Sequence, residues 1–286
     1  MGGKQMTNTK NLTEGNILNS LVRFAVPILF TLFLQALYGG VDLLVVDQFA
    51  ETADVSGVAT GSMLLQTATM IITGLTMGIT ILVAEKIGSK EPKAAGQAIG
   101  GGICLFAAFA IILTILMVAG AEILAKLMQA PAEAFGQTTM YIRICGAGAI
   151  FIVAYNVLGA IFRGIGDSKT PLLTVAIACV INIFGDLLLV AVFHMGAAGA
   201  AIATVAAQGV SVLISLAIIR KKQLPFILTK KDIRFSKKII GKELKLGTPV
   251  ALQECLVGIS FLVIQMIVNS FGVVASAGVG VAEKVC

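Results

Sequence analysis

Long apolar runs separated by short polar segments dominate the chain. A membrane-spanning helix needs about 20 apolar residues, and seven runs are long enough. We place them at residues 20–48, 57–84, 96–120, 138–162, 171–193, 197–219 and 245–271, and an eighth begins near Val273. The pattern predicts an all-α polytopic membrane protein.

Composition supports lipid as the solvent around this fold. Apolar residues make up 57% of the 286-residue chain and charged residues 13%, whereas soluble domains carry about 25% charged residues. A soluble fold of this length could not bury so many apolar side chains. We therefore expect a multi-pass protein of the cell membrane, with the lipid bilayer as its surroundings.

Basic residues gather on alternate connections between the runs, and the formal net charge is +6. Cytoplasmic loops of membrane proteins carry an excess of Lys and Arg, so we expect the N-terminus and these connections to face the cytoplasm. Charges placed in this way lie beside lipid headgroups, and nucleic acid is not an expected partner. The longest basic stretch lies between the sixth and seventh runs and contains Arg220, Lys221, Lys222, Lys230, Lys231, Arg234, Lys237, Lys238, Lys242 and Lys245.

The sequence after this basic stretch is similar to the beginning of the chain. Phe24-Ala-Val-Pro27 parallels Leu246-Gly-Thr-Pro249 at an offset of 222, and Ser56-Gly-Val-Ala59 parallels Ser276-Ala-Gly-Val279 at an offset of 220. Six spans separate the copies, so both copies start on the same side of the membrane, as in the parallel repeats of transporters.

The repeat divides the chain into three segments. We predict a six-helix N-terminal lobe at 1–219, a cytoplasmic basic linker at 220–244 and the start of a C-terminal lobe at 245–286. Because this second copy holds little more than one span, we expect the chain to be part of a protein with about twelve spans.

Five polar side chains fall at a similar depth in the outer half of three spans. Asp42 lies in the first span. Asn182 and Asp186 are four residues apart in the fifth span, as are Thr204 and Gln208 in the sixth, so each pair shares one helix face.

Polar groups inside a bilayer are costly, which leaves two interpretations. The side chains could pair only to hold the helices together. Alternatively, Asp42 and Asp186 could exchange a proton or bind a cation, since a carboxyl group in a low-dielectric cavity does both readily.

Several segments resemble the multidrug and toxin extrusion (MATE) family. They are Gln35-Ala-Leu-Tyr38-Gly-Gly-Val-Asp42, then Phe162-Arg-Gly-Ile-Gly-Asp167-Ser-Lys-Thr-Pro171, then Asn182-Ile-Phe-Gly-Asp186, and the run from Gly196 to Gln208. The resemblance implies twelve helices in two lobes. It also implies export of organic cations or other amphipathic compounds in exchange for H+ or Na+ by alternating access.

The resemblance also implies the roles of individual residues. It places a cation-coupling site, open to either H+ or Na+, at Asp42, Asn182, Asp186 and Thr204. We assign Gln35, Tyr38, Asn156 and Gln208 to a substrate cavity. Apart from Na+ at the coupling site, no metal, no other cofactor and a monomeric protein are expected.

Three other functions compete with drug export. A lipid-linked oligosaccharide flippase of the related superfamily should have a cationic cavity. Here the charged residues at cavity depth are acidic, and no basic residue lies at that depth. A passive channel would show no dependence on an ion gradient. We do not expect an enzyme, because the chain has no DDxxD or HExxH motif.

Overall fold

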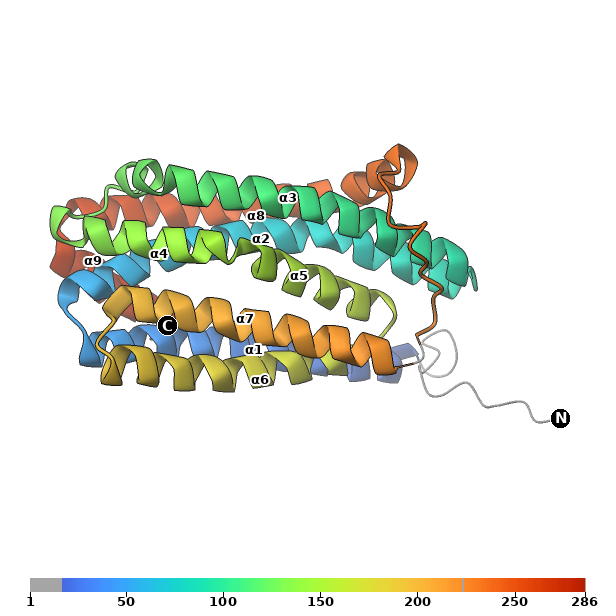
Figure 1. Cartoon of the computed structure of the whole chain (residues 1–286), viewed down its shortest axis with the longest axis horizontal. Helices are drawn as coiled ribbons and strands as arrows, with labels where there is room; N and C mark the ends of the chain where they lie inside the picture. The colour runs from blue at the N-terminus through green and yellow to red at the C-terminus, as the bar shows by residue number, and fades with distance from the viewer. Residues whose placement is uncertain (1–16, 223, 286) are drawn as a thin grey trace.

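A computed structural model describes residues 17–222 and 224–285, and all regular secondary structure in this part of the chain is helical, without strands (Figure 1). The elements in order are α1 (Ile17–Phe49), α2 (Thr52–Gly88), α3 (Pro92–Leu127), the short η1 (Ala132–Ala134), α4 (Phe135–Ala147), α5 (Ala149–Gly164), α6 (Lys169–Asp186), η2 (Leu187–Val192), α7 (Gly196–Lys221), α8 (Lys237–Ser270) and α9 (Val273–Val285).

These helices confirm the predicted fold class. Six of them are long and apolar enough to cross a membrane, and α4 with α5 makes a seventh span if the bent pair is counted as one. The predicted run at 138–162 is therefore broken, with a bend of 53° between its two halves. The break lies at Gly148, where a Cβ atom would collide with Val205 of α7, so the bend coincides with a close approach between helices.

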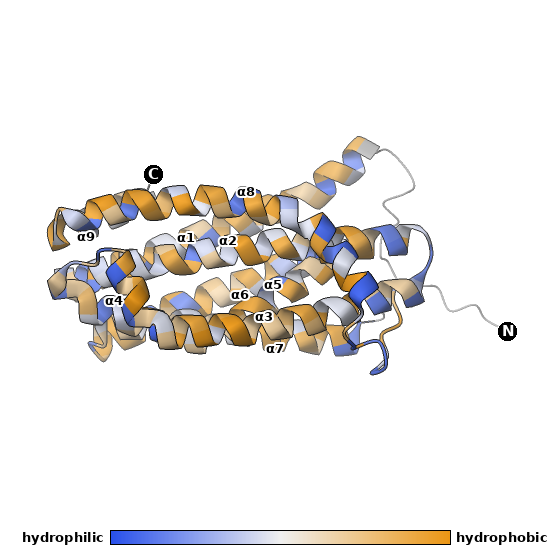
Figure 2. Cartoon of the chain, turned by 90° about the horizontal axis from the view of Figure 1, so that it is seen from above, coloured by the Kyte–Doolittle hydropathy of each residue, from blue (hydrophilic) through white to orange (hydrophobic). Residues whose placement is uncertain are grey.

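The helices lie alongside one another, and the two ends of the bundle differ in polarity. One end holds the connections at 89–91 and 165–168 and the segment 224–236; we call it the linker end. Hydrophilic residues are concentrated there (Figure 2). The opposite end holds the connections at 50–51 and 128–134. The side of the membrane that each end faces stays a prediction.

Close backbone contacts join α2 to α8 along the bundle. A Cβ atom added to Gly74 of α2 would lie 2.6 Å from Ala251 Cα of α8, and one added to Gly258 of α8 would meet Thr67 of α2. In lipid, helices associate through such small-residue faces, because they allow extensive van der Waals contact. Helix α8, which begins the second copy of the repeat, thus packs along the middle of α2 in the first copy.

Two counterparts of the predicted repeat touch each other. The Ser56 hydroxyl of α2 donates a hydrogen bond to the Ser276 hydroxyl of α9 at 2.7 Å, and both side chains are buried. Residues that lie near an axis relating two copies are expected to meet in this way. The division into two lobes remains a prediction, and this contact supports it.

Candidate cation-coupling site

Three helices bring the four predicted coupling residues together. Asp42 comes from α1, Asn182 and Asp186 from α6, and Thr204 from α7. All four are buried, and Asp186 is 0% exposed. The Asn182 amide donates a hydrogen bond to the Thr204 hydroxyl at 3.4 Å, and the carboxyl group of Asp186 interacts with that of Asp42.

The local backbone explains how α6 presents its two residues. Asn182 and Asp186 are one helical turn apart, so both face α1 and α7. Gly185 lies between them, and a Cβ atom there would come 2.9 Å from Ala203 Cβ of α7. Directly after Asp186, the α-helix becomes a π-helix over Leu187–Val192. Such π-helical turns are rare and occur often at functional sites.

Buried oxygen atoms remain without donors at this site. Both carboxyl oxygens of Asp186 and the Oδ1 atom of Asn182 accept no hydrogen bond from any residue that the structure describes. Two ionised carboxylates in contact repel each other, and burial makes their charge more costly. A proton or a cation between Asp42 and Asp186 would relieve both costs. Oxygen atoms are also the ligands that hard cations prefer.

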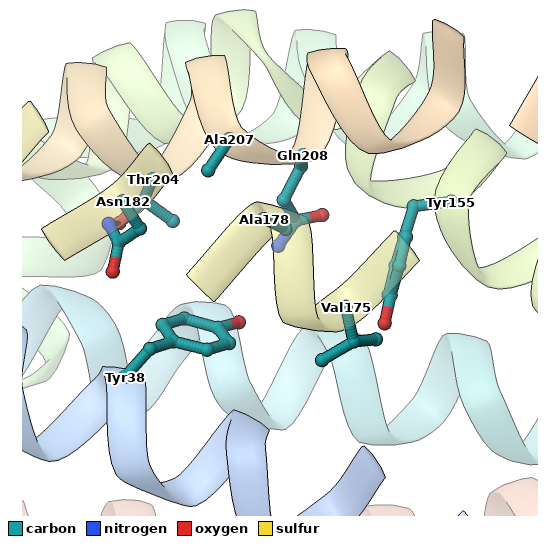
Figure 3. A pocket seen from close by; sticks show the side chains of 8 residues that line it. All are labelled: Tyr38, Tyr155, Val175, Ala178, Asn182, Thr204, Ala207 and Gln208. Atoms are coloured by element: carbon teal, nitrogen blue, oxygen red, sulfur yellow. Dashed lines mark hydrogen bonds between the residues drawn. The ribbon is translucent and has the colours of Figure 1, made fainter. Parts of the chain in front are cut away.

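A small cavity adjoins the coupling residues on the side toward the linker end. Its volume is about 10 Å³, which is room for about one water molecule. Tyr38, Asn182 and Gln208 converge on it from α1, α6 and α7 (Figure 3). The cavity can therefore hold a water or a small ion, and it is too small for a drug molecule.

The predicted cavity residues fall into two groups. Tyr38 and Gln208 line the small cavity. Gln35 donates a hydrogen bond to the Tyr155 hydroxyl at 3.0 Å. Asn156 accepts a hydrogen bond from the Thr73 hydroxyl of α2 at 2.9 Å. Gln35 and Asn156 thus contact neighbouring side chains and are not among the described residues that line this cavity.

Two tyrosines were missed by the sequence analysis. Tyr155 of α5 lines the cavity, and Tyr141 of α4 is 1% exposed and interacts with both Asp42 and Asp186. Tyr38 is the third tyrosine of a chain that contains only three, so all three lie at the site. The signal was present in the sequence, since a phenol within an apolar span needs a polar partner when buried.

Comparison with known proteins gives a consistent result. The MatE family model matches residues 27–188, which is more than half of the chain. The probable multidrug resistance protein YpnP of Bacillus subtilis is 30% identical over 96% of this chain and 61% of its own length. The probable multidrug resistance protein YoeA of the same organism is 25% identical over 97% of this chain and 61% of its own length. The chain thus spans about three fifths of the length of these relatives.

Solved structures share the fold. An outward-facing multidrug resistance MATE family transporter of the MOP superfamily superposes with a TM-score of 0.80 at 26% identity, over 88% of this chain and 56% of that one. A MATE structure in the straight conformation superposes with a TM-score of 0.84 at 24% identity, over 96% of this chain and 61% of that one. With a family model over most of its first five spans and this fold, the chain belongs to the MatE family.

Proposed function

We propose that this chain provides the ion-coupling lobe of a secondary active multidrug efflux transporter. The protein would export organic cations or amphipathic xenobiotics by antiport with H+ or Na+ through alternating access. The observation that carries this proposal is the meeting of Asp42 and Asp186, from different helices, in a buried chamber with Asn182 and Thr204 beside them. The relatives described as multidrug resistance proteins support it.

The cation would act at Asp42 and Asp186, with Asn182 and Thr204 as further oxygen ligands. Loading of one monovalent cation cancels one of the two negative charges and lets the carboxylates share it, and emptying the site leaves them to repel each other. An ion can drive a conformational change only if its affinity differs between the two states. We therefore assign a different distance between α1 and α6 to the loaded and the empty states.

A route from this site to the second lobe starts one residue after Asp42. Leu43 is 2% exposed, and a Cβ atom added to Gly280 of α9 would lie 3.7 Å from Leu43 Cδ2. Movement of α1 relative to α6 would therefore change the packing of α1 against α9 directly. This contact is how cation loading would change the packing between lobes.

The substrate would bind outside the chamber, because the cavity beside the coupling residues has room for a water or an ion only. We place the substrate between the two lobes, where alternating access would expose it to each side in turn. The protein would work as a monomer in the cell membrane, with its linker end facing the cytoplasm.

Replacement of Asp42 tests the proposal, with Asp47 as a matched control on the same helix. Asp42 is buried, whereas Asp47 is exposed. In everted vesicles, with sodium and pH gradients varied separately, Asp42→Asn should reduce gradient-driven efflux of a fluorescent cation to background. Asp47→Asn should transport like the unchanged protein. Efflux by Asp42→Asn at the unchanged rate, with normal membrane expression, would remove Asp42 from the mechanism.

A further inference from the structure

A second cavity lies at the linker end, far along the bundle from the coupling site. Its volume is about 280 Å³, near the lower end of the range of about 300–1,000 Å³ typical of small-molecule pockets. Helices α2, α3 and α8 and the segment before α8 all contribute to its walls. The polar and charged residues among those that line it are Lys86, Gln97, Asp232, Arg234, Ser236, Lys238 and Lys242.

Four cations and one carboxylate make this cavity electropositive. Lys86 pairs with Glu85 at 3.2 Å and with Glu91 at 3.3 Å. Among the residues that the structure describes, Lys238 and Lys242 form no ion pair. Arg234 lies near the carboxylate of Asp232, which also lies near Lys93.

The cavity is held in shape by a segment fixed to α3. The Ile227 amide donates a hydrogen bond to the Pro92 carbonyl at 3.1 Å. The backbones of Ile227 and Asp232 also pack so closely on Gly96 and Gly100 that Cβ atoms there would collide with them. Arg234, Lys238 and Lys242 are exposed, but together with Lys86 they line one defined space.

Apolar side chains beside the cavity place it at the membrane surface. Ile227 is 57% exposed, Ile233 44% and Phe235 66%, and Lys230, Lys231 and Arg234 lie between them in the sequence. Segments of this composition lie at the boundary between headgroups and acyl chains. Basic pockets between helices on the cytoplasmic side suit the headgroups of anionic lipids.

We infer that this cavity binds the phosphate group of an anionic phospholipid from the cytoplasmic leaflet. Lys and Arg are the side chains that bind phosphate, through charge-assisted hydrogen bonds. Lys86 and Gln97 belong to the predicted first lobe, whereas Lys238 and Lys242 lie on α8. A phosphate between them bridges α8 to α2 and α3, supplies the counter-charge that Lys238 and Lys242 lack, and stabilises the arrangement in which α8 is packed on α2 and α3. The inference rests on the proposed orientation of the linker end and not on transport.

Thermal unfolding of the purified protein in nanodiscs tests the site. We compare neutral phosphatidylcholine with increasing phosphatidylglycerol for the unchanged protein, for Lys238→Gln/Lys242→Gln, and for Lys230→Gln/Lys231→Gln. All four lysines are exposed, and the last variant removes the same charge from residues outside the cavity lining. Phosphatidylglycerol should raise the melting temperature of the unchanged protein and of Lys230→Gln/Lys231→Gln by about 2–4 °C, the shift typical of about 1 kcal/mol. At least half of that rise should be lost in Lys238→Gln/Lys242→Gln.

Other results would overturn the inference. Equal loss in both double variants would mean that only the general surface charge matters, and no rise in the unchanged protein would mean that no lipid phosphate binds. A separate arm adds inorganic phosphate to the protein in neutral lipid, against sodium chloride of equal ionic strength. Stabilisation there that matches the effect of phosphatidylglycerol would identify soluble phosphate as the ligand and contradict the lipid source. All outcomes are independent of whether the protein transports drugs.

Discussion

At the scale of single residues, the coupling site shows which features a sequence reveals. Asn182 and Asp186 were predicted to share a face because the helical repeat requires it, and the structure places both at the chamber with Asp42 and Thr204. The depth of a residue in the membrane follows from its position along the helix, because the rise per residue is fixed. Polar residues within an apolar span are rare and therefore easy to recognise in the sequence. Whether these residues couple transport to an ion stays a prediction.

Tyr155 shows where residue-scale reasoning stops. Its helix, α5, is set at 53° to the preceding one, and this angle decides that its hydroxyl reaches Gln35 of α1. A one-dimensional pattern contains no information about such an angle. The polarity of a lone phenol was visible in the sequence, but its partner was not.

Thr204 offers a residue-scale test of the site. Its hydroxyl accepts the hydrogen bond that orients the Asn182 amide, so Thr204→Val should weaken ion coupling while Thr204→Ser restores it. Removal of a residue that orients the ligands of an ion typically lowers the affinity for that ion by about 10–100-fold. We expect about a tenfold higher ion concentration for half-maximal efflux in Thr204→Val. Equal ion dependence in the Val and Ser variants would argue that the hydroxyl has no such role.

At the scale of elements, Asp167 fixes the start of α6 and joins it to the end of α7. Its carboxylate accepts hydrogen bonds from the backbone amide of Thr170 at 3.1 Å and from the Thr170 hydroxyl at 2.6 Å, and it pairs with Lys222 at 2.6 Å. The preceding Gly166 has a φ of 80°, a conformation that favours glycine. This segment is one of those that resemble the MATE family, and the structure gives it a role in holding two helices.

Asp167→Asn should lower stability by about 1–2 kcal/mol, because it weakens a helix cap and removes an ion pair. Burial alone raises the pKa of Asp167, but the hydrogen bonds from Lys222 and Thr170 outweigh it and hold the pKa below its usual value of 3.8. The stabilisation is therefore complete above that value and is lost as the pH falls through the lower, folded-state pKa.

Thermal unfolding of both proteins across pH checks this prediction. The difference in melting temperature between the unchanged protein and Asp167→Asn should be constant from about pH 7 to 5 and should shrink below about pH 4. A difference that stays constant to the lowest pH would show that the carboxylate charge contributes nothing.

The bend at Gly148 and the π-helix after Asp186 mark the limit of prediction at this scale. Apolar periodicity predicted the spans, because lipid demands about 20 apolar residues for each. The break depends on the approach of Val205 from α7, which is a tertiary contact. The π-helix changes the hydrogen-bond spacing without any marker in the residue types.

At the scale of the whole molecule, α2 and α8 form the seam between the first six spans and the following copy. Gly74 lies in this seam, whereas Gly120 of α3 has nothing within 4 Å of an added Cβ atom. The repeat itself was visible in the sequence as Pro27 and Pro249. The pairing of α2 with α8 was not, since the spacing of Gly74 and Gly78 favours close helix packing but does not identify the partner helix.

Gly74→Val should force α2 and α8 apart and destabilise the protein by about 1–3 kcal/mol, the usual cost of overpacking. Gly120→Val is the matched control, because it puts the same side chain where an added Cβ atom has nothing within 4 Å. Unfolding in detergent with a series of denaturant concentrations measures both. Equal stability of the two variants would contradict the seam described here.

Asp42 and Asp186 are proposed to hold one cation between them, and counting bound cations in the purified protein tests this most directly. Proton uptake is followed with an indicator dye and Na+ binding with a radioactive tracer, for the unchanged protein, Asp42→Asn, Asp186→Asn and the double variant. Each single variant should lose the same one cation, and the double variant should lose no more. A double variant that loses two cations, or a single variant that binds as the unchanged protein does, would contradict a shared site.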